Sequence, residues 1–213
     1  MNQSEIDKFK VGKSAEQKRV IDYFTKQGCC AAFGVMKDEE YRALVRARRD
    51  TLGLSDQRKP LDKLGIDESQ VNEIAPVCLQ GYLVPKAFAK KTAAGSWVTS
   101  CYEVTWIFFG SHQIYLYIMS FNMDEDRKQE VTQEFFYKDV TAMSTASKTY
   151  SSEGDASERI KSVGDAKCEF EKLVFQITVP GEKLTVAMDE DEVPDRERIV
   201  QAMKHKLREK KSS

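Results

Sequence analysis

Cysteine and histidine are the side chains of this 213-residue chain with the clearest potential for chemistry. Cys29 and Cys30 are adjacent and could form a nucleophilic or redox pair. A catalytic cysteine, however, needs a neighbouring base that holds it as a thiolate. The two histidines are His112, in an expected turn, and His205, on an expected basic helix, and neither has a ligand-like neighbour in the sequence. Small packing residues are therefore the better interpretation of the cysteine pair.

The acidic run Asp124-Glu125-Asp126 has a superficial similarity to a calcium-binding loop. It lacks the glycine and the spaced terminal glutamate that complete such a coordination shell, so an exposed turn is expected instead. The five cysteines, at positions 29, 30, 78, 101 and 168, are odd in number and have no C-x-x-C spacing. This pattern fits neither a disulfide framework nor a zinc site, so we expect no metal and a reducing, cytoplasmic location.

The sequence motifs of common enzyme classes are absent. It contains no G-x-S-x-G, no H-E-x-x-H, no glycine-rich phosphate loop and no dinucleotide fingerprint. We therefore expect no catalytic residue and no cofactor, and a binding protein rather than an enzyme.

Charge and hydropathy exclude further classes of protein. Thirty-three basic and thirty-four acidic side chains leave a net charge of -1, so no overall field attracts nucleic acid or an anionic membrane. The basic stretch Lys204–Lys211 lacks the interleaved aromatic residues of a nucleic-acid platform. No run approaches the roughly 18 apolar residues of a membrane span, and the polar N-terminus contains no signal-like apolar stretch.

The first third of the chain is predicted to be helical. Ser14 is a suitable N-cap and Gly28 a suitable C-cap for a helix over Ala15–Gln27, whereas residues 1–13 are polar and expected to be loose. Further helices are expected over Lys37–Leu52, Ser55–Leu64 and Asp67–Ile74. We therefore expect an all-helical segment over residues 1–74.

From Pro76 the apolar pattern changes to the alternation of strands. The clearest signal is a hairpin of two long strands, Trp97–Phe109 and Ile114–Met123, that reverses at Gly110-Ser111. The other expected strands are Pro76–Val84, Gln129–Phe136, Val140–Ser147, Leu173–Val179 and Leu184–Met188. Pro85–Ser96 is expected to be a connection and Ser151–Ala166 a mobile loop. A helix over Pro194–Lys210 is predicted to bury Ile199, Met203 and Leu207.

Both faces of the central hairpin are apolar, which predicts cover on both sides. One face carries the aromatic-rich set Tyr115, Tyr117, Met119 and Phe121. Left exposed, it would form a contiguous apolar patch. Two alternatives stay open: the N-terminal helices cover it through Val20, Phe24, Leu44 and Val45, or it is an interaction surface for a second subunit or partner.

About seven antiparallel strands followed by one amphipathic helix resemble a pleckstrin-homology-like (PH-like) domain of the bacterial type. The likeness is carried by Val104–Phe109, Phe136–Val140 and the helix Ile199–Lys211. It implies an α+β fold in which two near-orthogonal sheets form a partly open antiparallel β-barrel, capped by the C-terminal helix. This domain would span residues 75–213, after a helical segment, residues 1–74, that resembles no family.

The resemblance implies binding of a phospholipid headgroup, a peptide or a partner protein. Lipid-binding members hold phosphates with basic residues in the loop where this chain has Lys86, Lys90 and Lys91, and usually with another in the next strand. Trp97–Phe109 contains no Lys or Arg, and its one charged residue is Glu103. We therefore favour an interaction module that binds a protein or a copy of itself. The alternatives are weak binding of anionic lipid through the lysine loop and, less favoured, an unrecognised enzyme.

Overall fold

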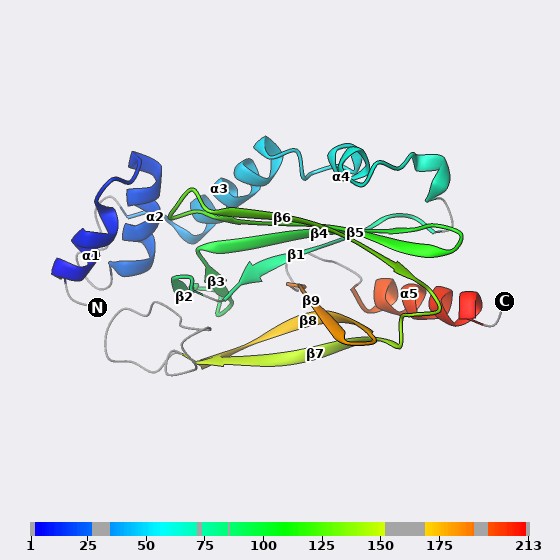
Figure 1. Ribbon diagram of the computed structural model, residues 1–213. Coiled ribbons are helices and arrows are strands. Elements are labelled where there is room, and N and C mark those ends of the chain that lie inside the picture. Colours follow the sequence, from blue (N-terminus) through cyan, green and yellow to red (C-terminus); the bar gives the residue numbers. More distant parts are fainter. Residues whose placement is uncertain are drawn as a thin grey trace.

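The computed structural model describes residues 3–26, 35–71, 74–84, 86–151, 169–189 and 196–211. Within these ranges the chain has an α+β fold of five α-helices and three antiparallel sheets. Figure 1 shows three layers: the N-terminal helices, a central four-stranded sheet, and a three-stranded sheet with the C-terminal helix beside it.

The N-terminal segment is helical, as predicted, but it begins earlier than expected. Residues 1–13 were expected to be loose, whereas α1 (Gln3–Lys10) is a helix, because Ile6 buries its side chain in the core. Ser14 caps α2 (Ala15–Thr25) in a capping box with Gln17. The remaining helices are α3 (Asp38–Thr51), α4 (Arg58–Leu64) and the short 3-10 turn η2 (Glu68–Gln70). The expected cap Gly28 and the pair Cys29-Cys30 lie outside the described residues.

The central sheet has the strand order β1-β4-β5-β6. Its members are β1 (Val77–Leu83), β4 (Cys101–Phe109), β5 (Gln113–Asn122) and β6 (Lys128–Phe136). The predicted hairpin is confirmed, because β4 pairs with β5 from Cys101 opposite Asn122 to Phe109 opposite Ile114. β4 and β5 lie inside the sheet and are buried along most of their length, as expected for strands that are apolar on both faces.

The first strand of that hairpin is shorter than predicted. Trp97–Thr99 forms a separate strand, β3, which pairs with β2 (Ala89–Lys91) in a two-stranded sheet within the expected connection. Ser100 marks the corner, since its N–H donates to the Phe88 carbonyl and its own carbonyl accepts from Met123. The chain bends at Ser100 because these partners lie outside the β4–β5 ladder.

The third sheet has the order β7-β8-β9 and comprises β7 (Ala142–Ser151), β8 (Glu169–Val179) and β9 (Glu182–Ala187). In the Pro180-Gly181 turn between β8 and β9, Gly181 has a positive φ of 84°, a backbone angle that residues with a side chain rarely adopt. Nine strands therefore occur in the described residues, two more than predicted, because of the extra hairpin of β2 and β3. The loop predicted over Ser151–Ala166 falls almost entirely outside the described ranges.

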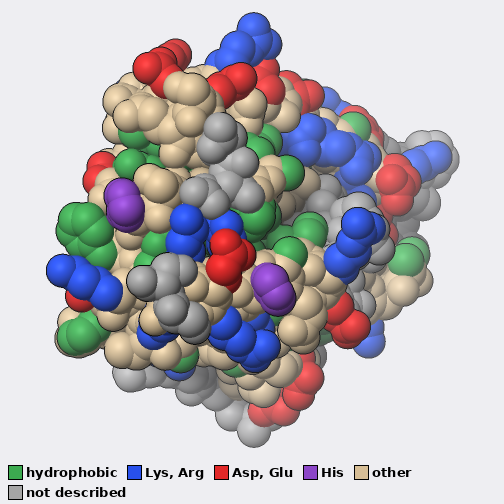
Figure 2. Space-filling view, turned by 90° about the vertical axis from the view of Figure 1, so that its right-hand side faces the viewer, with side chains coloured by type: hydrophobic (Ala, Val, Ile, Leu, Met, Phe, Trp, Pro, Cys, Tyr) green, Lys and Arg blue, Asp and Glu red, His purple; other side chains and the backbone are tan. Residues whose placement is uncertain are grey.

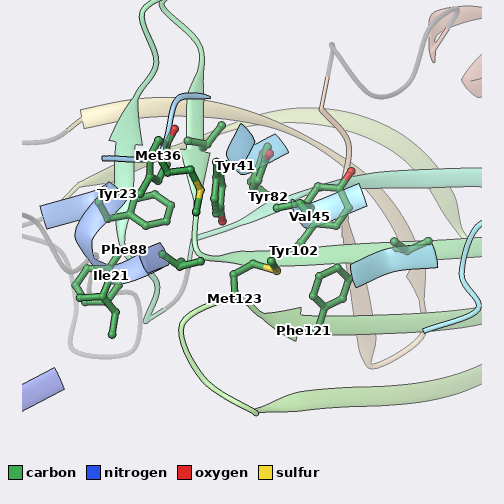
Figure 3. Packing of buried hydrophobic residues seen from close by; sticks show 14 of the residues in the cluster. Ile21, Tyr23, Met36, Tyr41, Val45, Tyr82, Phe88, Tyr102, Phe121 and Met123 are labelled. Atoms are coloured by element: carbon green, nitrogen blue, oxygen red, sulfur yellow. The ribbon is translucent and has the colours of Figure 1, made fainter. Parts of the chain in front are cut away.

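The upper core lies between the N-terminal helices and the central sheet. A row of stacked and edge-on rings runs from α2 to β5 through Tyr23, Tyr41, Tyr82, Tyr102 and Phe121, with centroid separations of 4.6, 6.4, 5.0 and 5.8 Å (Figure 3). The Tyr41 hydroxyl also donates to the Thr99 carbonyl oxygen at 2.6 Å. The helical segment and the sheet thus share one continuous core.

The lower core lies between the two larger sheets and includes the C-terminal helix α5 (Arg196–Lys211). Met203 is fully buried there, and Val200 and Leu207 are nearly so. The predicted stripe named Ile199 instead of Val200, but Ile199 is only partly buried. The helix packs through residues 200, 203 and 207 because these positions lie on one side of a helical turn.

Candidate functional site

The two larger sheets are joined along a seam between β1, β4 and the end of β9. The backbone N–H of Asp189 donates to the Gln80 carbonyl at 3.0 Å, and the Tyr82 N–H donates to Asp189 Oδ2 at 2.8 Å. Gly81 lies at the closest approach, where an added Cβ would be 3.0 Å from the Asp189 nitrogen. Glycine suits this position because a Cβ atom would require the Asp189 backbone to give way by a few tenths of an ångström.

A buried carboxyl group completes the seam. Glu103 Oε1, from β4, accepts the N–H of Ala187 at 2.9 Å and is only 8% exposed. Desolvation raises the pKa of Glu103 to about 7, although the hydrogen bond from Ala187 favours the charged form. Glu103 therefore connects the central sheet to β9 with a carboxyl group whose protonation changes near neutral pH.

Beside this seam, two adjoining hollows form what we call the inter-sheet trough. The first, of about 330 Å³, lies between α3, β1, β3 and the three-stranded sheet. The second, of about 560 Å³, lies between α5 and the three-stranded sheet. They share Leu173 and Met188. The trough therefore runs along β7 and β8 from Arg42 at one end to Lys204 at the other.

An ion pair between Lys172 and Asp189 lines the first hollow. Lys172 Nζ donates to Asp189 Oδ1 at 2.6 Å and to the Trp97 carbonyl at 3.0 Å, and it lies 5.3 Å from the centre of the Tyr82 ring. The two charged side chains are only 10% and 13% exposed. Because both Asp189 oxygens accept hydrogen bonds within the protein, this pair positions the walls of the hollow. At the mouth, Arg42 Nη2 donates to Ser96 Oγ at 2.8 Å.

The second hollow is lined by both apolar and charged side chains. Leu173, Met188 and Val200 supply apolar surface, while Arg198 and Lys204 line the α5 side. Thr145 contributes from β7, which is one of the two edge strands of its sheet, and no other described strand pairs with its outer side. An edge strand beside an apolar hollow combines a row of main-chain hydrogen-bonding groups with a surface that can receive side chains.

The three lysines of the predicted anion loop do not converge. Lys90 Nζ lies 3.6 Å from Asp38 Oδ1 and 4.0 Å from the centre of the Tyr23 ring, so it ties β2 to the N-terminal helices. Lys91 is exposed. Lys86 instead lines a hollow of about 340 Å³ together with Arg127 and Lys128. The other basic groups of that hollow therefore come from Arg127, just before β6, and from Lys128 at its start.

The predicted interaction surface on β5 lies inside the chain. Tyr117, Met119 and Phe121 are at most 2% exposed and belong to the upper core, together with Val20, Phe24 and Val45. Tyr115 is partly buried against the cluster of Leu61, Val71 and Phe108. Of the two alternatives, cover by the N-terminal helices is thus the one observed, since their apolar faces meet these rings. The four side chains line an internal interface and not an exposed docking surface.

The described residues give little support for cysteine chemistry or for metal binding. Burial raises the pKa of the Cys101 thiol to about 12 and that of Cys78 to about 11, so both are protonated at neutral pH. In the described ranges, no three His, Cys, Asp or Glu side chains gather as a metal site. Among the helices of those same ranges, none has the length and apolar character needed to cross a bilayer.

Sequence reasoning missed Arg42, Lys172 and Asp189, because their contacts join positions that are far apart in the chain. Asp189 begins the acidic run Asp189-Glu190-Asp191-Glu192, which precedes the C-terminal helix in the sequence. For Glu103 a signal existed, since it is the one charged residue in a strand that is apolar on both faces. No protein-family model matches this chain, and no match to it was found among curated proteins or solved structures.

Proposed function

We propose that the chain is a protein-interaction module with a PH-like barrel, and that its inter-sheet trough receives an extended peptide segment of a partner. The PH-like assignment is supported by the order of elements. A four-stranded antiparallel sheet precedes a three-stranded one, and the final helix then packs in the core that both sheets share. Because a fold of this kind hosts many activities, the function has to be argued from the trough itself.

The outer edge of β7 is the observation that carries the proposal. β7 is ten residues long, and its outer side faces no other strand of the described chain. An extended peptide can add to such an edge through main-chain hydrogen bonds, each contributing about 1 kcal/mol net. Alternate peptide side chains would then lie on the same face of the sheet as Thr145, which lines the second hollow. Main-chain pairing supplies affinity, and the hollows supply side-chain selection.

The proposal predicts that peptides selected on the intact chain bind along β7. Peptides enriched from a random displayed library should shift the amide resonances of β7 and of the α5 residues that line the trough. Thr145→Trp should abolish this binding by filling the second hollow, since Thr145 is exposed and lines that hollow. The shifts would be mapped by heteronuclear NMR, and the affinities measured by calorimetry.

Ser144→Trp is the matched control, because successive side chains of a strand point to opposite faces. It should leave peptide binding within about two-fold of the wild-type affinity. Selected peptides that bind Thr145→Trp as tightly as wild type, or that shift only resonances remote from β7 and α5, would disprove the trough as the docking site.

Binding of an anionic lipid headgroup is the second candidate function, and the hollow of Lys86, Arg127 and Lys128 favours it. Lys86 has a positive φ of 58°, the one described case outside glycine, and such strained backbone is often kept at functional sites. Arg127, however, pairs with Glu125 at 3.0 Å. That carboxylate reduces the positive charge that the hollow can offer to a phosphate.

We therefore expect weak attraction to anionic membranes, without headgroup selectivity. In sedimentation with phosphatidylserine vesicles, binding should fall steeply as salt is raised, because each exposed basic residue contributes only about 1 kcal/mol. Adding a phosphoinositide at constant surface charge should change nothing. Selective binding of one phosphoinositide at physiological salt, lost in the Lys86→Ala/Arg127→Ala/Lys128→Ala variant, would make lipid recognition the better assignment.

A further inference from the structure

We infer that two copies of this chain pair through the outer edge of β6, which joins their central sheets into one continuous sheet across a two-fold axis. β6 is nine residues long and ends the strand order β1-β4-β5-β6, so β5 is the one described strand that pairs with it. An edge of this length is a template for another strand. The inference is independent of the peptide trough, because β7 belongs to a different sheet.

The hydrogen bonds at the two ends of β6 show which of its main-chain groups face outward. The Tyr137 N–H donates to the His112 carbonyl at 3.2 Å, and the Asn122 N–H donates to the Arg127 carbonyl at 3.0 Å. Both pairs continue the antiparallel register of β5 with β6, in which hydrogen-bonded pairs alternate with non-hydrogen-bonded ones. The odd-numbered residues of β6 therefore bond to β5. The main-chain groups of four even-numbered residues point away from it: Lys128, Glu130, Thr132 and Glu134.

This edge is accessible in the described part of the chain. All four of these residues are exposed, and within the described ranges no other group hydrogen-bonds to their outward main-chain atoms. Helix α4 lies inward of the edge, because its Leu61 packs against Phe108 of β4. It reaches β6 through Lys59 and Lys63, whose Nζ atoms lie 3.8 and 3.4 Å from the Glu130 carboxylate. The helix therefore leaves the strand edge open.

Charge complementarity points to a second copy of the chain as the occupant of this edge. When the two-fold axis passes through Val131, Lys128 of each copy lies opposite Glu134 of the other. Glu130 then lies opposite Thr132, and the two Val131 side chains face each other. Opposite charges directly across two strands stabilise their pairing. The strand is thus complementary to itself in this register.

Shifted registers are less favourable. A shift of the axis by one residue toward the end of β6 places Glu130 opposite Glu134, and a shift by one toward its start places Glu130 opposite itself, so that like charges meet. A shift by two toward the end needs the Phe136 carbonyl, which already accepts the Asp139 N–H at 3.0 Å. Charged side chains commonly protect a strand edge from pairing, and here they favour one register over its neighbours.

Apolar surface offers a weaker basis for self-association. The large apolar side chains that are exposed in the described ranges are those of Phe9, Val11 and Phe136. Figure 2, which views the end of the molecule where α5 finishes, shows apolar side chains interrupted by charged and polar groups. A strand edge with matched charges is therefore the better candidate for the contact between copies.

Sedimentation equilibrium of the full chain tests the inference and should show reversible dimers between about 10 μM and 1 mM. Lys128→Glu and Glu134→Lys each place like charges on both sides of the axis, so each should weaken self-association at least about ten-fold. The two variants are complementary to one another, because every charged pair between them joins opposite signs. An equimolar mixture, with one variant fluorescently labelled, should therefore form mixed dimers with about the wild-type affinity.

Two further variants complete the test. Lys91→Glu makes the same charge change at an exposed site outside β6 and should alter the affinity by less than about two-fold. Thr132→Pro removes one outward N–H and no bond to β5, so it should abolish the dimer while circular dichroism stays unchanged, as in the control Thr132→Ala. A chain that stays monomeric at about 1 mM would overturn the inference. So would dimers that neither charge reversal weakens, or reversals that the mixture does not rescue.

Discussion

Replacing Met203 by aspartate should lower the free energy of unfolding by at least about 4 kcal/mol, which is a large part of the roughly 5–15 kcal/mol that stabilises a typical domain. Met203 is fully buried between α5 and the two larger sheets. A carboxylate at this position would be desolvated among apolar side chains without a charged partner, and burial of an unpaired charge is among the costliest single changes. Denaturant titration followed by circular dichroism measures the loss.

Two variants separate this effect from a general weakness of α5. Met203→Leu keeps the volume and apolar character of the side chain, so it should cost less than about 1.5 kcal/mol. His205→Asp places the same carboxylate two residues away, on the exposed side of the helix, and should cost no more than about 1 kcal/mol. If Met203→Asp and His205→Asp were equally stable, α5 would not be part of the core.

The second large effect concerns Glu103 and depends on pH. Burial raises the pKa of Glu103 from 4.5 to about 7 in the folded chain. The folded state then holds its proton more tightly than the unfolded state. The contribution of the protonated Glu103 to the free energy of unfolding is therefore fully present below about pH 4.5 and is lost as pH rises through about 7. A shift of this size corresponds to a loss of roughly 3 kcal/mol above pH 7.

Glu103→Gln should remove this loss, because the amide keeps an oxygen that can accept the Ala187 N–H and carries no charge. The variant should be more stable than wild type by up to about 3 kcal/mol at pH 8, and the two proteins should be equally stable at pH 4. Unfolding in urea across this pH range measures the difference.

Glu134→Gln, on the exposed side of β6, is the control and should leave the pH dependence as in wild type. A constant stability difference between Glu103→Gln and wild type from pH 4 to pH 8 would show that Glu103 is not charged and desolvated in the folded chain.

The elements that the sequence determined by itself are those whose signals are local. Ser14 and Gln17 lie close enough in the chain to form the cap of α2 without any other contact. The alternation of apolar residues on either side of Gly110 predicts β4, β5 and their turn. Both the two-residue period and the turn residues lie within about thirty positions of the sequence. The sequence also predicted that the aromatic face of β5 is covered, since a contiguous apolar patch is costly in water, but it left open whether the N-terminal helices or a partner cover it.

The tertiary structure alone decided the features that depend on contacts between distant residues. The chain turns at Ser100 because its partners are Phe88 and Met123, and no local signal separates β3 from β4. Val200 replaces Ile199 in the core because the rotation of α5 is set by the sheets against which it packs.

The trough has the same origin. Lys172 reaches Trp97 across 75 positions and Asp189 across 17, and Glu103 meets Ala187 across 84. Sequence spacing carries no information about such pairs, because burial and charge pairing arise only when separate strands are brought together. The lysine loop illustrates the converse. Lys86, Lys90 and Lys91 are neighbours in sequence, but the fold gives them three different surroundings, so their common charge does not make a common site.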